Sequence, residues 1–409
     1  MISVPGRVVC GLSLLALLGN SLPAQDATPP PGSHLQIFLM TMGPGREVYE
    51  RFGHNAIWVR DSVLKRDLVY NYGTFDFRDP NLVPRFAMGR PVYWLGVDDL
   101  DGTMRTYAYH ERDVEVQELD LPPLKRAELA LRLAENARPE QREYVYDYYR
   151  DNCSTRVRDI LDDVLDGALQ RATVGKPADG TLRWHTHRSL VNDKLMYVGI
   201  LAALGPMVDQ PLDEWGEMFL PQKLQERVRA LTVTAADGRS VPLVKGEGRL
   251  LEIGKYAVEA EPPNWGPMFS LVALALTLAL LSGLIDGLLG VPGRLLGAAW
   301  LFVMGLGGIA LLFLWFVTNH VASADNRNVL LFSPLALMVI PGVLSTARRS
   351  PRSWAPRAAW FVLASAIVGS LLAAIPSVGG QWNLQLAELT ALPTVAAAWL
   401  AIRLSPRRA

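Results

Sequence analysis

The stretch Tyr-Asp-Tyr-Tyr-Arg-Asp-Asn-Cys-Ser-Thr-Arg at residues 146–156 carries Cys153. The other cysteine of the chain, Cys10, lies in an N-terminal segment with a basic start, an apolar run and a small-residue exit. These features predict a secretory signal peptide over residues 1–24 that is removed from the mature protein. Cys153 is then a lone thiol in an exported chain. It is either a small buried hydrophobe, an intermolecular pairing site or a reactive group.

The residues around Cys153 favour the reactive alternative. Apolar residues recur at helical spacing from Val157 onward, and Asp151 or Asn152 supplies an N-cap. Cys153 therefore falls in the first helical turn, where free backbone N–H groups, the helix dipole and Arg156 all favour a thiolate. We expect a lowered pKa for the Cys153 thiol. We also expect its backbone N–H and the Asn152 side chain to hold an oxyanion, whereas the alternative is a packed structural cysteine.

Composition divides the 409-residue chain in two. Lys+Arg and Asp+Glu number 40 each, so no net charge indicates a nucleic-acid partner. Charged residues are frequent up to Pro262, and five apolar stretches close to the roughly 20 residues that span a bilayer follow it. We predict an exported domain at 25–262 and an all-α transmembrane domain at 263–409. Its five helices lie at about 267–289, 294–317, 328–346, 358–376 and 385–403.

The loops between these stretches predict the orientation. Basic residues gather in the first loop, the third loop and the tail, namely Arg294, then Arg348, Arg349, Arg352 and Arg357, then Arg403, Arg407 and Arg408. Under the positive-inside rule, residues 25–262 lie outside an inner (plasma) membrane and the C-terminus lies in the cytoplasm.

Alternating apolar residues predict the strands of the exported domain. We expect an antiparallel meander with a helix at 124–137, its strands lying at 35–40, 52–60, 68–73, 92–97, 103–109 and 114–119. Alternation places His54 on one face with Ala56 and Trp58, where it is a candidate general base or a hydrogen-bonded structural histidine. Asn71 on the next strand is a candidate to orient His54, although a one-residue shift would bring Tyr70 or Tyr72 instead.

A second pair of histidines, His185 and His187, has no third ligand at a recognisable spacing. We interpret the pair as a solvated or substrate-facing surface feature rather than a metal site. The site centred on Cys153 is predicted to use neither a metal nor a cofactor.

The order of the two catalytic candidates is the reverse of papain, because His54 in Phe-Gly-His-Asn-Ala-Ile-Trp-Val precedes Cys153 in Asp-Asn-Cys-Ser-Thr-Arg. The chain resembles the circularly permuted branch of the NlpC/P60-like thiol enzymes. Within that branch it is most similar to the Lnb-type periplasmic domain of a bacterial lipoprotein N-acyltransferase. The likeness extends over most of residues 35–225, and it is supported by Tyr70–Phe77, Arg188 and Glu217–Pro221. It implies an α+β, circularly permuted papain-like fold.

The membrane part resembles the same family at the loop Thr318–Asn328. The resemblance implies that His320, Asn326 and Asn328 face the exported domain at the membrane surface. There they would position a lipid head group or the acceptor, or simply cap the membrane helices.

Together, residues and resemblance favour an acyltransferase. Cys153 would take a fatty acyl group from a membrane phospholipid and pass it to the N-terminal amine of a lipoprotein, with His54 as the base. One alternative is a membrane-bound cysteine hydrolase of peptides or lipid esters, and another is a non-catalytic envelope scaffold. Thiol reactivity separates enzyme from scaffold. The fate of the acyl group, on an amine or on water, separates the two enzymes.

Overall fold

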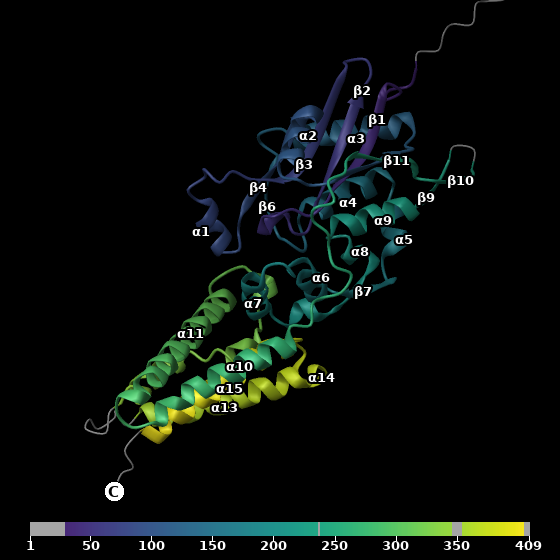
Figure 1. Cartoon of the computed structure of the whole chain (residues 1–409). Helices are drawn as coiled ribbons and strands as arrows, with labels where there is room; N and C mark the ends of the chain where they lie inside the picture. The colour runs from purple at the N-terminus through teal and green to yellow at the C-terminus, as the bar shows by residue number, and fades with distance from the viewer. Residues whose placement is uncertain (1–28, 236–237, 346–353, 405–409) are drawn as a thin grey trace, which may run out of the picture.

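A computed structural model describes residues 29–235, 238–345 and 354–404 (Figure 1). The predicted signal peptide lies outside the described residues, as do Cys10, Arg348, Arg349, Arg352, Arg407 and Arg408.

The exported part is an α+β domain built on one seven-stranded sheet with the order β11-β5-β1-β2-β3-β4-β6. Neighbouring strands are antiparallel throughout. The strands are β1 Leu35–Met42, β2 His54–Asp61, β3 Arg66–Thr74, β4 Val92–Asp99, β5 Val114–Leu119, β6 Glu143–Val145 and β11 Val244–Leu251. Strands β1 to β4 form the predicted meander, whereas β5 pairs with the edge of β1 that β2 does not occupy.

One predicted strand is wrong. Residues 100–109 form the helix α2, Leu100–Tyr109, because the Asp99 side chain accepts a hydrogen bond of 2.6 Å from the Gly102 N–H and caps it. Met104 and Tyr107, three residues apart, pack together on the sheet core. The N-cap and this helical spacing outweigh the strand propensity of the threonines and tyrosines in this segment.

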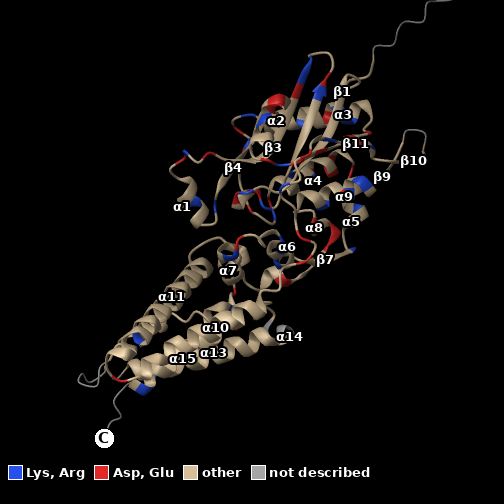
Figure 2. Cartoon of the chain, viewed as in Figure 1, with Lys and Arg blue, Asp and Glu red and all other residues tan. Residues whose placement is uncertain are grey.

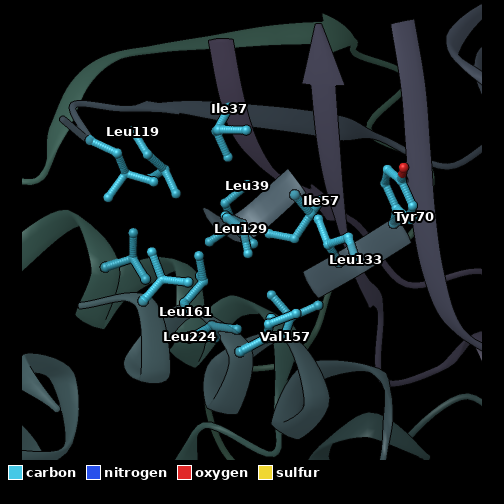
Figure 3. Close-up of a cluster of buried hydrophobic side chains, with 14 of the residues drawn as sticks. Ile37, Leu39, Ile57, Tyr70, Leu119, Leu129, Leu133, Val157, Leu161 and Leu224 are labelled. Carbon is cyan, nitrogen blue, oxygen red and sulfur yellow. The ribbon is translucent and has the colours of Figure 1, made fainter. Parts of the chain in front are cut away.

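Helices cover both faces of the sheet. α3 (Pro123–Asn136), α4 (Cys153–Val164) and α9 (Pro221–Ala230) share one core with the sheet, and α2 packs on the other face. Figure 3 shows Leu129 and Leu133 of α3, with Leu161 of α4, directed toward the sheet. All three are fully buried, and each such side chain contributes roughly 1.5–3 kcal/mol to stability. This packing fixes the start of α4, where Cys153 lies.

Shorter elements complete the exported part. They are α1 Leu82–Ala87, α5 Ala168–Thr173, α6 Leu182–Ser189, α7 Lys194–Ala203, α8 Glu214–Glu217 and the small strands β7 Pro177–Thr181, β8 Pro211–Asp213, β9 Thr232–Thr234 and β10 Ser240–Pro242. Tyr197 and Leu201 of α7 are buried in the same core as the membrane helices. By packing, α7 belongs to the junction of the two parts.

Four helical segments among the described residues are long and apolar enough to span a membrane: Gly266–Leu284, Gly287–Phe316, Ala355–Ala374 and Leu384–Leu404. Their main helices are α10 Gly266–Leu281, α11 Val291–Phe316, α13 Ala355–Ala374 and α15 Leu384–Leu404, and the short α14 Pro376–Gly379 follows α13. Figure 2 shows very few charged residues along this bundle, whereas the exported part carries many.

The third predicted helix, at 328–346, is not continuous. It consists of a 3-10 turn at Arg327–Leu330, an irregular stretch and the short α12 at Ala336–Val343. Pro334 and Pro341 lie in this segment and each lacks the N–H of a regular helix. Leu331 is 1 % exposed, so the irregular backbone lies among protein atoms, where a membrane segment tolerates it.

The broken segment nevertheless runs the length of the bundle. Asn328 at its start hydrogen-bonds Asn383, just before α15. Gly342 near its end lies beside Ala401 near the end of α15. The segment therefore packs along α15 from one end of that helix to the other.

Gly308 of α11 makes room for this segment, which leads to a prediction. A Cβ at Gly308 would lie 1.9 Å from the Phe332 carbonyl oxygen, a backbone atom that cannot move aside alone. Gly308→Ala should lower the thermal midpoint in detergent by several degrees, although alanine normally favours a helix. The matched control is Gly297→Ala on the same helix, whose Cβ would lie 3.2 Å from the Val343 side chain. Equal midpoints for the two variants would contradict the close packing.

Candidate active site

The helix α4 begins at Cys153 because Asn152 caps it. The Asn152 side-chain oxygen accepts hydrogen bonds from the Ser154 and Thr155 N–H groups at 2.8 and 2.9 Å. The Thr155 hydroxyl in turn accepts from the Asn152 N–H at 2.8 Å, which completes a capping box. Cys153, 8 % exposed, therefore occupies the first helical position, as the sequence predicts.

The capping role corrects the second role predicted for Asn152. Its side-chain N–H₂ donates to the Tyr148 carbonyl at 2.9 Å and to the Phe219 carbonyl at 3.0 Å. Both amide hydrogens are therefore engaged in the fold, and none is left for an oxyanion. Asn152 positions Cys153 and does not stabilise charge beside it.

Arg156 is likewise engaged elsewhere. Its guanidinium forms a double hydrogen bond with the Asp151 carboxylate, with one contact of 2.6 Å, and lies 4.0 Å from the Tyr144 ring centre. The paired carboxylate offsets the positive charge, so the predicted activation of Cys153 by Arg156 does not hold. The guanidinium that does lower the pKa of Cys153 is that of Arg112.

The sulfur of Cys153 faces backbone donors from two elements. The N–H groups of Asn55 on β2, and of Ser154 and Cys153 itself on α4, stabilise the thiolate. The Asn55 N–H is available to the sulfur because β2 does not pair with β3 at this residue. Their pairing begins at Asp61–Arg66 and ends at Ile57–Tyr70. The two strands separate beyond that point, and α4 packs against both of them there. The N–H of Asn55 is a feature that sequence reasoning missed.

The expected low pKa of Cys153 is wrong. Burial raises the pKa of the thiol above its ordinary value, and the backbone N–H groups and Arg112 only partly oppose this. The helix N-terminus is present as predicted, but the loss of hydration on burial outweighs it. The resting thiol is therefore mainly protonated at neutral pH.

His54 and Asn71 meet as the sequence predicts. The His54 Nε2–H donates to Asn71 Oδ1 at 3.3 Å, which leaves Nδ1 as the ring nitrogen for a proton. The Asn71 side-chain N–H₂ lies 3.5 Å from Asp98 Oδ2 and so holds the amide in this orientation. Tyr70 and Tyr72 pack in the core that also contains Cys153, and Asn71 is the residue of this strand that contacts His54.

The imidazole of His54 is neutral in this environment. Burial, followed by the charge of Arg112, lowers the pKa of His54 to about 4, although the hydrogen bond to Asn71 opposes the shift. A neutral imidazole and a protonated thiol are the forms that suit general-base catalysis, in which the proton moves only as the sulfur attacks.

The charge of Arg112 lowers the pKa of both Cys153 and His54, and this role was not predicted. Its Nε donates to the Gly43 carbonyl at 2.9 Å and its Nη1 lies 3.6 Å from Glu50 Oε1. Among the described residues its buried Nη2 has no hydrogen-bond partner. Arg112 follows the helix that the sequence misassigns as a strand, so no pattern in the sequence directs it toward the site.

In the loop Thr318–Asn328, Asn326 and Asn328 are buried, whereas His320 is partly accessible. Asn326 and Asn328, 1 % and 0 % exposed, both donate to the carbonyl of Ala202 at the end of α7. They bond the membrane loop to α7, in keeping with the expectation that they face the exported domain. Because both amides are buried and used on the end of that helix, they fit the capping alternative rather than contact with a lipid head group. His320 is half-buried, with Nδ1 placed 3.4 Å from the Tyr148 hydroxyl.

A family model described as the Lnb N-terminal periplasmic domain matches residues 30–193. A second one, described as the Lnb transmembrane domain, matches residues 260–403. The chain belongs to the Lnb family. No curated protein and no solved structure matches the chain.

Membership of the Lnb family confirms the resemblance to the Lnb-type periplasmic domain and its membrane part. The chain is a polytopic membrane protein whose N-terminal domain is periplasmic. Cys153, His54 and Asn71 all lie within the matched periplasmic domain.

The histidine pair is not the surface feature that the sequence suggested. His185 is fully buried, and its Nε2 lies 2.9 Å from the Asp179 carbonyl and 3.3 Å from Glu217 Oε1. His187 is 7 % exposed and contacts the Tyr197 ring, with the ring centres 4.7 Å apart. Both histidines lie on the short helix α6, and both side chains are buried. The spacing of apolar residues in this segment did not predict their burial.

The raised pKa of Cys153 gives a testable pH profile. Alkylation by a small neutral reagent should rise with pH to a midpoint above roughly 8.5, the value of a free cysteine, because only the thiolate reacts. Arg112→Met should move the midpoint further up, since Arg112 lowers this pKa.

The control for this profile is a cysteine at Leu195, which is 85 % exposed, in a Cys153→Ser background. Its midpoint should lie at the free-cysteine value. A Cys153 midpoint below that of the control would contradict the effect of burial.

Proposed function

We propose that this Lnb-family protein transfers a fatty acyl group from a membrane phospholipid, through a thioester on Cys153, to the N-terminal amine of a lipoprotein. The observation that carries the proposal is the position of the thiol. It lies at the start of α4, faces the Asn55 N–H, and sits in a periplasmic domain where Asn71 orients His54. This arrangement suits nucleophilic acyl transfer.

The first half-reaction forms the thioester. As the sulfur of Cys153 attacks the ester carbonyl carbon, the thiol proton passes to Nδ1 of His54. The N–H groups of Asn55 and Cys153 stabilise the negative carbonyl oxygen, and one such donor is worth roughly 3 kcal/mol in acyl-transfer enzymes. The ester C–O bond then breaks, and the departing lysolipid oxygen takes the proton from His54.

The second half-reaction moves the acyl group onto the acceptor. The neutral lipoprotein amine attacks the thioester carbon while His54 takes one of its protons. The C–S bond breaks as the C–N bond forms, and the thiolate recovers a proton from His54. With water in place of the amine, the same residues would perform the hydrolase reaction, so the acceptor decides between the two functions.

The link to the membrane supports a lipid donor. Tyr148, whose carbonyl accepts from Asn152 beside the thiol, also contacts His320 in the membrane loop. Phospholipid and lipoprotein are both held in the bilayer, so a site tethered to it meets them at a raised effective concentration. We assign His320 to the surface that receives them.

The remaining assignments complete the proposal. We infer five membrane crossings with the broken segment as the third, a cytoplasmic C-terminus and residence in the inner membrane. The described basic residues Arg294, Arg357 and Arg403 support this orientation. The order of His54 before Cys153, on a strand and a helix start, supports a circularly permuted papain-like domain.

A trapping experiment tests the chemistry. Purified full-length protein is incubated with phospholipid labelled in its acyl chains, without acceptor, and the protein is then treated with neutral hydroxylamine. The proposal predicts a hydroxylamine-labile label on Cys153. When a lipopeptide with a free N-terminal amine is added, the label should appear on that amine, whereas release only as free fatty acid would favour the hydrolase.

A further inference from the structure

A row of aromatic side chains leads across the surface of the periplasmic domain. Phe77 contacts Phe75 with ring centres 4.9 Å apart, Phe75 stacks on Tyr93 at 4.9 Å, and Tyr93 contacts Tyr146 at 4.5 Å. Tyr49 adds to the outer end, 5.4 Å from Phe75. These five residues form what we call the aromatic row. Phe77 and Tyr49 are 68 % and 48 % exposed, so the outer end of the row is open.

The inner end of the aromatic row reaches the thiol. The Cβ position of Gly73 lies 3.4 Å from Tyr146 Cε2 and 3.5 Å from the Cβ of Cys153. Gly73 adopts a φ of +88°, which disfavours any other residue, so no side chain separates Tyr146 from Cys153. The Tyr144 hydroxyl, 3.8 Å from the same position, is buried without a hydrogen-bond partner among the described residues.

The outer end of the row continues into the β3–β4 connection, which touches the membrane part. The Met88 carbonyl accepts from the Asn319 N–H at 3.0 Å, just beyond α11. A Cβ at Gly89 would lie 2.7 Å from the backbone nitrogen of His320, so the chains are in close contact. In Figure 1, α1 within this connection lies on the side of the sheet that faces the membrane helices.

The same connection exposes apolar side chains beside the end of a membrane helix. Val83 and Phe86 of α1 are 72 % and 50 % exposed, and Phe316 at the end of α11 is 70 % exposed. Phe86 also contacts the ring of His320. An exposed apolar surface next to a membrane segment is typical of an element that lies in the bilayer interface.

We propose that the aromatic row binds the acyl chain of a membrane lipid, which enters beside α1 and is guided to Cys153. This inference rests on the proposed function and names its binding surface. An acyl chain is the occupant that the structure favours, because the connection that carries Phe75 and Phe77 also contacts the membrane part, while Tyr146 at the other end of the row lies next to Cys153. Aromatic faces supply a large apolar area and fix few rotamers.

Thiol-specific reagents of different chain length test this surface without the acyl-transfer reaction. In an alkyl methanethiosulfonate, the thiolate of Cys153 attacks the sulfenyl sulfur. A disulfide forms to the alkylthio group and methanesulfinate leaves. The full-length protein in lipid nanodiscs is treated with the methyl and the dodecyl reagent, and the ratio of the two rates measures chain recognition.

Phe77→Ser and Phe75→Ser should each reduce the dodecyl-to-methyl ratio by about tenfold, which corresponds to losing part of one apolar contact. The methyl rate should stay unchanged, since it reports only the thiol. Phe75→Leu keeps an apolar side chain and should restore most of the ratio. Tyr109→Ser, which alters an 85 % exposed aromatic residue on α2, is the matched control and should leave the ratio unchanged.

The outcomes separate the surface from the enzyme activity. A fall in the ratio for both serine variants and not for Tyr109→Ser supports the aromatic row, even if no acyl group ever reaches Cys153 from phospholipid. An unchanged ratio in Phe75→Ser and Phe77→Ser, with a normal methyl rate, overturns the aromatic row even in a protein that transfers acyl groups.

Discussion

Cys153→Ser should abolish acyl transfer, with a loss on the order of 10³-fold or more in kcat/KM. A serine hydroxyl is a far poorer nucleophile than a thiol near neutral pH, and its proton is harder to remove. His54→Ala should be nearly as severe, because the buried thiol has a raised pKa and depends on a base for its proton. Labelled phospholipid and a lipopeptide acceptor measure both variants.

Asp163→Asn is the control for this pair, since Asp163 lies on the exposed side of the same helix as Cys153. It should retain full activity. Thermal unfolding of each variant distinguishes loss of chemistry from loss of structure. Activity that survives in a well-folded Cys153→Ser protein would remove the nucleophile from the mechanism.

Arg183→Met should give the largest loss of stability. Arg183 and Asp209 form an ion pair of 2.7 Å with both side chains 3 % exposed, and Arg183 also donates to the Leu204 and Gly205 carbonyls. Its removal leaves a buried carboxylate without its cation, at a cost of roughly 3–5 kcal/mol. Thermal unfolding in detergent measures the effect. Because Asp209 also accepts from the Trp382 N–H, the change should loosen the junction with the membrane part.

The double variant Arg183→Met with Asp209→Leu isolates the cause. If the unpaired charge is responsible, the double variant should be more stable than Arg183→Met alone. Arg78→Met, which breaks an exposed ion pair with Asp76, should leave the midpoint unchanged. A midpoint for Arg183→Met equal to that for Arg78→Met would contradict the role of the buried pair.

The parts of the fold set by local patterns were predictable from the sequence. Alternation predicted β2 and β3 and placed Asn71 beside His54. An N-cap followed by helical spacing predicted the start of α4 at Cys153. Runs of apolar residues predicted four of the membrane helices. Pro334 and Pro341 were visible signals that the remaining segment is not a regular helix, because proline interrupts helical hydrogen bonding.

Features that depend on distant contacts were not predictable. The engagement of the Asn152 amide involves the carbonyl of Phe219, 67 residues away. The pKa of Cys153 was predicted with the wrong sign because the helix dipole is local, whereas burial results from the packing of the whole domain. The site role of Arg112 depends on the loop at Gly43, 69 residues earlier, to which its guanidinium is bonded.

Mass spectrometry of lipoprotein N-terminal peptides tests the central claim most directly. Cells that have no other source of lipoprotein N-acylation and carry this protein are compared with the same cells carrying Cys153→Ser at the same level. The account predicts an acyl group on the N-terminal amine in the first cells and a free amine in the second. An acylated amine in both, or a free amine in both, would contradict it.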